Sequence, residues 1–115
     1  MVVDDHPINR LLAVALLKKL GWSVLEAENG NLALGLAAQN PHLRLVLLDI
    51  SMPGLSGEET CTRLRATVTS TPLHIVAYTA HAFPEDLKRF LDTGFDDVLI
   101  KPINLMRIQE LTANL

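Results

Sequence analysis

A run of apolar residues, Leu45 to Leu48, ends abruptly at the carboxylate of Asp49 and is followed by a Pro53-Gly54 turn. A run without polar alternation is typical of a strand that is buried on both faces of a parallel sheet. Four further short apolar stretches, bounded by polar residues, glycine or proline, predict additional strands. The five predicted strands cover residues 1–3, 23–27, 43–48, 73–78 and 98–100.

Each predicted strand is followed by a stretch in which apolar residues recur at helical spacing. Proline opens two of these stretches, where its missing N–H costs nothing, and glycine ends two. In the first stretch the spacing is carried by Ile8, Leu11, Leu12, Ala15 and Leu16. In the fourth we expect an inner face formed by Leu87, Phe90 and Leu91. The predicted helices cover residues 7–20, 32–39, 57–68, 84–93 and 105–111.

Two helix starts carry side chains suited to capping. The segment Ser56-Gly57-Glu58-Glu59 matches a capping box, in which the serine accepts a bond from the N–H of Glu59 and the glutamate reaches back. Asn104 occupies the capping position before the last helix. The first of these signals predicts where a helix begins after the strand that ends at Asp49.

Five strands that alternate with five helices, without a repeat or a linker, determine the fold class. Such alternation gives right-handed βαβ units and a doubly wound α/β domain, with one parallel sheet and helices on both faces, over residues 1–115. The pattern alone leaves the strand order open. The first strand is shorter than the mean of about 5–6 residues, so we expect it to be trimmed and the chain to be part of a longer protein.

The composition narrows the class of function. Hydrophobic residues are 49% of the 115 residues, which is typical of a globular domain and excludes a largely disordered chain. A formal net charge of −3 does not indicate a nucleic-acid surface. Cys61 is the single cysteine, which suits a reducing, cytoplasmic compartment. Since no apolar run approaches the roughly 20 residues of a bilayer span, we expect no membrane insertion by this segment.

The carboxyl ends of parallel strands meet at one edge of the sheet, where open α/β sheets bind ligands. The residues that the sequence brings to this edge are Asp4, Asp5, Asp49, Thr79 and Lys101. Three carboxylates so close together repel one another unless a cation joins them, and an oxygen-rich cluster suits Mg²⁺. The hydroxyl and the ammonium could bind phosphate oxygens. Asp49 is then suited to attack phosphorus and to form an aspartyl phosphate.

The order of these residues along the chain resembles that of a known family. The motifs are Asp4-Asp5, Asp49, Met52-Pro53, Gly57, Thr79-Ala80 and Lys101-Pro102. Together they resemble the receiver domain of response regulators in two-component signalling, and the resemblance covers essentially the whole chain. It implies a flavodoxin-like sheet with strand order 2-1-3-4-5. It also implies a cis peptide bond before Pro102, as X–Pro bonds allow.

The resemblance implies a role for each residue of the cluster. Asp49 would be the phosphoacceptor, and Thr79 and Lys101 would bind the phosphoryl group. Mg²⁺ would be held by Asp4, Asp5, Asp49 and the backbone carbonyl of Ser51. The domain itself would have at most a slow autophosphatase activity, and its partner would be a histidine kinase or a histidine phosphotransfer domain.

The segments around the site resemble receivers of hybrid sensor histidine kinases. They are Asp4-Asp5-His6-Pro7-Ile8-Asn9-Arg10, Thr79-Ala80-His81-Ala82, Gly94-Phe95-Asp96-Asp97 and Lys101-Pro102-Ile103. Such receivers pass phosphate to a histidine phosphotransfer domain and do not bind DNA. The resemblance therefore implies a segment of a hybrid kinase, in the cytoplasmic part of a membrane-anchored sensor, and we expect it to be a monomer.

Two positions depart from the family pattern. The family often has an aromatic residue three positions before the lysine, and Val98 stands there, so we expect the usual aromatic switch to be altered. Ser56 stands where many relatives have aspartate, and either residue caps a helix.

Two other classes of function fit the fold less well. An aspartyl-phosphate phosphohydrolase of the haloacid-dehalogenase type needs a second aspartate two residues after the nucleophile, where Ser51 stands. A flavin-binding electron carrier needs a neutral phosphate loop after the first strand, where Asp4 and Asp5 place negative charge instead.

The remaining histidines and the cysteine have ordinary interpretations. His6, His42, His74 and His81 lack metal-ligand spacing, and we expect none to be a phosphodonor. His81 lies two residues after Thr79, where a solvent-exposed role is the simplest interpretation. Cys61 has no neighbouring pattern of a reactive thiolate, so we expect a small, partly buried side chain.

Overall fold

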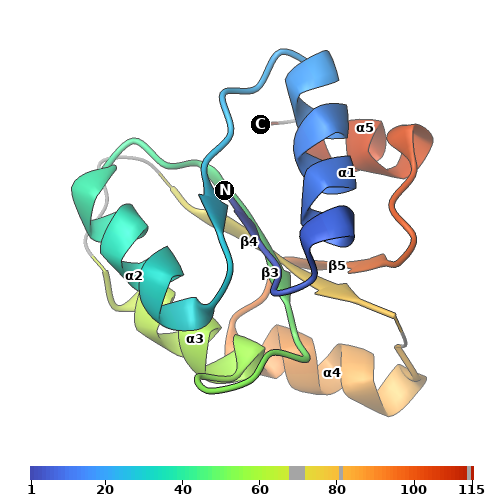
Figure 1. Ribbon diagram of the computed structural model, residues 1–115. Coiled ribbons are helices and arrows are strands. Elements are labelled where there is room, and N and C mark those ends of the chain that lie inside the picture. Colours follow the sequence, from blue (N-terminus) through green and yellow to red (C-terminus); the bar gives the residue numbers. More distant parts are fainter. Residues whose placement is uncertain (68–71, 81, 114) are drawn as a thin grey trace.

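Strand β3 (Leu45–Asp49) is buried along its whole length, as its uninterrupted apolar run predicts. It lies in the middle of a five-stranded sheet of order β2-β1-β3-β4-β5, in which all neighbouring strands pair in parallel (Figure 1). The computed structural model describes residues 1–67, 72–80, 82–113 and 115. The doubly wound fold and the strand order expected from the sequence are therefore confirmed.

The elements follow one another in strict alternation. The strands are β1 (Val2–Val3), β2 (Glu26–Ala27), β3 (Leu45–Asp49), β4 (His74–Thr79) and β5 (Asp97–Ile100). The helices are α1 (Pro7–Lys19), α2 (Gly30–Gln39), α3 (Gly57–Arg65), α4 (Pro84–Thr93) and α5 (Leu105–Thr112). The predicted end of the third helix at Val68 and the residue His81 lie outside the described residues. None of the described helices has both the length and the apolar character that a bilayer crossing requires.

Helices cover both faces of the sheet and divide the core into two layers. Helices α1 and α5 lie on one face, and α2, α3 and α4 lie on the other (Figure 1). The first layer includes Leu17 and Ile108 packed with Leu47 and Tyr78. The second layer is built largely from residues of the other three helices and from the opposite side of the strands. In this layer Phe90 of α4 packs edge-to-face on Phe95. Alternate residues of each central strand thus serve different layers.

The burial of α4 differs from the sequence expectation. Phe90 is buried, but Leu87 and Leu91 are 39% and 56% exposed, so the expected inner face of three residues is wrong for two of them. In α1 three of the five residues that carried the spacing, Ile8, Leu11 and Leu12, are exposed large apolar side chains. The helix buries Ala13, Val14 and Leu17 instead. Because α1 has apolar residues all round, spacing alone could not select the face that packs.

Strand β2 covers Glu26–Ala27 and is shorter than the predicted strand over residues 23–27. Val2 pairs with Glu26 and Val3 with Ala27, and the N–H of Val2 donates to the Leu25 carbonyl at 2.8 Å. On the side of β3, the nitrogen of Met1 donates to the carbonyl of Leu45 at 2.7 Å. The pairing with β1 therefore extends back to the Leu25 carbonyl, while Ser23 and Val24 lie outside the strand.

The start of α3 confirms half of the predicted capping box. The Ser56 side chain accepts a hydrogen bond from the N–H of Glu59 at 3.1 Å. The Glu59 carboxylate does not reach back but pairs with Arg63 at 2.9 Å. The Asn104 cap of α5 is confirmed by its bond from Arg107 N–H at 2.8 Å. Both caps set the helix starts near the carboxyl edge of the sheet.

Gly57, the first residue of α3, lies directly against the end of β3. A Cβ at this position would lie 2.5 Å from the Asp49 carbonyl oxygen and 2.7 Å from Ile50 Cα. Backbone atoms cannot yield as a flexible side chain can, so this approach requires glycine. The close packing fixes the helix against the segment that carries Asp49.

Candidate functional site

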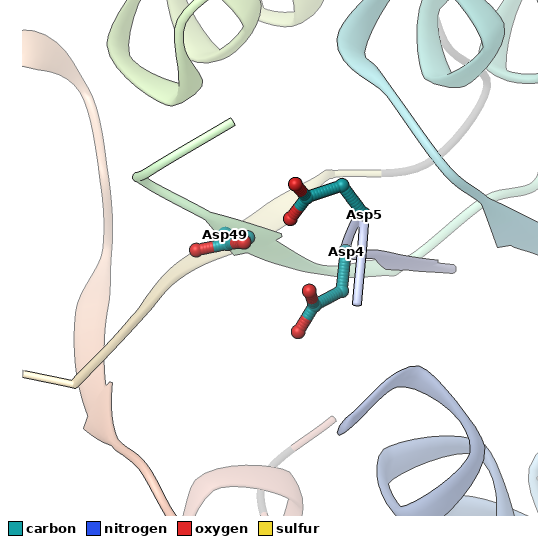
Figure 2. A group of neighbouring side chains, drawn as sticks. All are labelled: Asp4, Asp5 and Asp49. Carbon is teal, nitrogen blue, oxygen red and sulfur yellow. The ribbon is translucent and has the colours of Figure 1, made fainter. Parts of the chain in front are cut away.

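Three carboxylates converge where β1 and β3 end. Asp4 and Asp5 follow β1, and Asp49 is the last residue of β3. One ligand atom of each carboxylate lies within 4.8 Å of the others. Figure 2 shows the Asp4 and Asp5 side chains leaving the end of β1 on the side where Asp49 lies. The structure thus brings together the three residues that the sequence assigned to a cation.

The three carboxylates have different surroundings. Asp4 is fully buried, and its Oδ1 accepts from the backbone N–H of His6 at 2.9 Å. The guanidinium of Arg10, on α1, donates to the Asp4 backbone carbonyl at 2.8 Å and pins the loop that carries it. Asp5 is exposed. The cluster therefore joins a rigidly held carboxylate to one that is open to solvent.

Asp49 is almost completely buried, with 4% of its surface exposed. The pKa of its carboxyl is raised to about 6, chiefly by burial and also by the negative charge of Asp4, while Lys101 and the backbone N–H of Ser51 oppose the rise. The Ser51 N–H donates to Oδ1 at 3.2 Å. A carboxylate that lacks enough compensating positive charge is suited to interact with an incoming cation.

Lys101 reaches this cluster from the loop after β5. Its Nζ lies 3.1 Å from Asp4 Oδ2 and 3.4 Å from Asp49 Oδ1. Its backbone N–H donates to the carbonyl of Thr79 at 2.7 Å, which places the ends of β4 and β5 side by side. The Lys101-Pro102 peptide bond is cis, as expected. Thr79, which ends β4, is also buried.

Tyr78 is a residue of this site that the sequence did not single out. Its ring centroid lies 4.8 Å from Lys101 Nζ, and its side chain is buried. Burial and the nearby negative charge of Asp4 raise the pKa of the phenol to about 12, against the effect of a hydrogen bond to the Ile103 backbone. It is the single tyrosine of the chain and directly precedes Thr79. This position beside a predicted site residue was the only feature of the sequence that pointed to it.

Several other residues lie away from the chemistry. His6 caps α1, accepting from Asn9 N–H at 3.4 Å, and His74 lies at the opposite end of β4. His42 is exposed in a turn. Cys61 is fully buried rather than partly buried, and burial raises the pKa of its thiol to about 11. These surroundings do not activate any of the four for nucleophilic chemistry.

The charges of the cluster do not balance. Asp4, Asp5 and Asp49 supply three carboxylates, and Lys101 is the ammonium group that contacts two of them. Hard oxygen donors in this number fit a divalent cation of the Mg²⁺ class. The same edge would offer Lys101 to the oxygens of a phosphate group. The arrangement can therefore hold a cation and an anion beside the carboxylate of Asp49.

Comparison with known proteins identifies the family. The family model of the response regulator receiver domain matches residues 1–113. The sensor histidine kinase GacS of Pseudomonas protegens is 39% identical over an alignment of 114 residues that covers 96% of this chain and 12% of that protein. The sensor histidine kinase RcsC of Escherichia coli is 37% identical over 110 residues, or 96% of this chain and 11% of that protein. The chain thus spans roughly an eighth of the length of these relatives.

A solved structure agrees in both fold and sequence. The receiver domain of the sensor histidine kinase PA1611 from Pseudomonas aeruginosa superposes with a TM-score of 0.84 at 29% identity, over 96% of this chain and 89% of that one. That structure has a magnesium ion coordinated in its active-site cleft. The fold, the acidic edge and these matches lead to one conclusion: the chain belongs to the response regulator receiver domain family of two-component signal transduction, and its relatives include receiver segments of sensor histidine kinases.

Proposed function

We propose that this chain accepts a phosphoryl group on Asp49 from a phosphohistidine of a partner protein, and then relays it or changes its affinity for partners. The observation that carries the proposal is the contact of Lys101 Nζ with both Asp4 and Asp49, at 3.1 and 3.4 Å, beside an unbalanced carboxylate cluster. Family membership supports the same assignment.

The residues that would hold Mg²⁺ are the carboxylates of Asp4, Asp5 and Asp49 and the backbone carbonyl of Ser51. A bound divalent cation neutralises the charge that develops on phosphate oxygens. The donor set supports this role, because all three side chains are hard oxygen ligands that meet at one point. The magnesium ion in the cleft of the PA1611 receiver gives independent support.

The transfer itself would use side chains of this chain. A carboxylate oxygen of Asp49 attacks phosphorus, so that an O–P bond forms while the N–P bond of the phosphohistidine breaks and its electron pair returns to the imidazole. Lys101 pairs with a phosphoryl oxygen and Thr79 donates a hydrogen bond to another. Both residues stand at the ends of adjacent strands, joined by the bond between Lys101 N–H and the Thr79 carbonyl.

The setting that we propose is a segment of a hybrid sensor histidine kinase, with residues 1–115 forming the receiver. The relatives named above are sensor histidine kinases, which supports a histidine kinase or a histidine phosphotransfer domain as the partner. We propose that the segment acts in the cytoplasm as a monomer and does not bind DNA. A phosphohydrolase of haloacid-dehalogenase type is less well supported, because Ser51 stands where such enzymes have an acid.

The test is the intact mass of the protein after incubation with acetyl phosphate, with and without Mg²⁺. One phosphoryl adduct that requires Mg²⁺ and is absent from Asp49→Asn is expected, because the amide is nearly isosteric but not nucleophilic. Asp92→Asn, at an exposed position on α4, is the matched control and should gain the adduct.

The same variants should then be offered a phosphorylated histidine phosphotransfer domain. Transfer to the parent chain and to Asp92→Asn, but not to Asp49→Asn, would support the partner assignment. An adduct that persists in Asp49→Asn would refute the assignment of the phosphoacceptor, and rapid turnover of acetyl phosphate would favour a phosphohydrolase instead.

A further inference from the structure

The aromatic ring of Tyr78 lies beside Lys101 but has no role in the phosphoryl transfer proposed above. Tyr78 is 1% exposed, and its ring centroid lies 4.8 Å from Lys101 Nζ. A cation within about 6 Å of an aromatic face is attracted by the electron density of the ring, and more strongly when both are shielded from water. The side chain of Lys101 is only 16% exposed, so the contact is largely desolvated.

Tyr78 is itself held firmly on two sides. Its backbone lies in β4 and pairs with both β3 and β5, opposite Asp49 and Leu99. Its hydroxyl forms a hydrogen bond to the backbone of Ile103, two residues after Lys101. The ring therefore connects the strand that ends at Thr79 with the loop that carries the lysine, and it presents a fixed surface to the ammonium.

We propose that Tyr78 is a positioning residue that holds the Lys101 ammonium over the site while the lysine exchanges one oxygen partner for another. The proposal rests on the proposed function, in which Lys101 must leave Asp4 to pair with a phosphoryl oxygen. A carboxylate that held the lysine would compete with that oxygen. A neutral ring attracts the cation equally before and after the exchange, so it positions without competing.

The first experiment compares two equivalent truncations of buried rings. Tyr78→Leu should slow phosphorylation by acetyl phosphate about 3- to 30-fold at saturating Mg²⁺, which is the range expected for a lost cation–π contact. The Mg²⁺ concentration for half-maximal rate should not change. Phe90→Leu removes a ring of the other core layer that also lies near a cation, Arg89 at 5.1 Å, and should keep the parental rate.

The second experiment keeps the volume of the ring and varies its charge distribution. Tyr78→Phe should retain most of the rate, because the ring remains and only the hydroxyl bond to Ile103 is lost. Phenylalanines with one, two and three fluorine atoms at position 78 should slow the reaction step by step, because each fluorine withdraws electron density from the face. A rate that is independent of fluorination would overturn the proposal.

A third measurement needs no phosphoryl transfer. Protons above the face of an aromatic ring resonate upfield, so one of the four lysines of the chain should show shifted side-chain signals in the folded parent. Lys101→Arg identifies that signal, and Tyr78→Leu should return it to the ordinary position while Phe90→Leu leaves it shifted. Parental rates in Tyr78→Leu, or equal slowing in Phe90→Leu, would refute the positioning role. A parent that takes up no phosphoryl group would refute the proposed function, whereas a missing upfield signal would refute the ring contact.

Discussion

Charged side chains gather at both ends of the sheet, and the two clusters are built on different principles. At the carboxyl edge three carboxylates lie together, and Lys101 contacts the two that are buried, Asp4 and Asp49. At the amino edge, Arg65 faces Asp96 in a half-exposed ion pair. The carboxyl-edge cluster carries an excess of negative charge, whereas the amino-edge cluster pairs one cation with one anion.

The amino-edge cluster is also satisfied in its hydrogen bonds. The Arg65 guanidinium donates to the Gly94 carbonyl at 2.9 and 2.7 Å and to the carbonyl of Leu73. Asp96 accepts from the Ile75 backbone N–H at 2.8 Å as well as from Arg65. These bonds join α3, the end of α4 and the start of β4. The balanced charges of the amino-edge cluster thus stabilise the fold, while the unbalanced charges of the carboxyl-edge cluster leave room for a ligand.

Removing the cation of each cluster in turn should have the largest effect. Lys101→Ala should slow the proposed phosphorylation of Asp49 by about 100-fold or more, as does loss of a single charge-stabilising donor in enzymes. It should not weaken Mg²⁺ binding, because no carboxylate is lost. Time-resolved intact mass with acetyl phosphate measures the rate, and Arg65→Met should leave it unchanged. A Lys101→Ala variant as fast as the parent would show that the assigned role is wrong.

The second prediction exchanges a carboxylate for an amide at each end. Asp4→Asn should weaken Mg²⁺ binding at least about tenfold, since even changes behind a metal ligand cost that much. Asp96→Asn, the same chemical change at the amino edge, should leave the affinity as it is. Isothermal titration of the metal into the three proteins checks this. Equal affinities for all three would remove Asp4 from the site.

The third prediction concerns the amino-edge cluster and the stability of the fold. Arg65→Met should lower the free energy of unfolding by about 2 to 3 kcal/mol, because it leaves three backbone and side-chain acceptors without their charged donor. Arg63→Met, two residues earlier, loses only the exposed pair with Glu59 and should cost about 0.5 kcal/mol or less. Urea unfolding at neutral pH measures both. Equal losses would show that the amino-edge cluster is no more than a surface ion pair.

The smallest effect expected is a pH dependence of stability at the carboxyl edge. The pKa of Asp49 rises from its ordinary value of 3.8 to about 6 on folding, so the folded chain binds more protons between these values and its stability falls as the pH rises through them. Without metal, Asp49→Asn should therefore be more stable than the parent by about 1 to 2 kcal/mol above pH 6.

That advantage should disappear below about pH 4, where the carboxyl is protonated in both states. Urea unfolding of both proteins with a chelator, at pH 4 and pH 8, provides the measurement. An advantage that is the same at both pH values would point to packing rather than to charge.

Much of this molecule could be predicted from its sequence, because strand ends and alternation are local properties. Asp49, Thr79 and Lys101 each follow an apolar run, and a parallel sheet must bring such ends together. The strand order came from the family resemblance rather than from the pattern.

What failed depends on contacts between distant residues. Which face of α4 packs, and hence the exposure of Leu91, is decided by the neighbouring elements, and the spacing along the chain does not contain that information. Tyr78 looked like an ordinary core residue for the same reason, since its contact with Lys101 joins β4 to the loop after β5.

The contact between Gly57 and the end of β3 has a consequence for how substitutions spread. A methyl group at position 57 would overlap the main chain of Asp49 and Ile50, so the helix and the strand end have no spare room between them. Neither the helix nor the strand end can then be replaced independently. A loop taken from a relative would keep its conformation only if its helix were exchanged with it. For protein engineers, the end of β3, the loop and α3, residues 49 to 65, are therefore one unit of exchange.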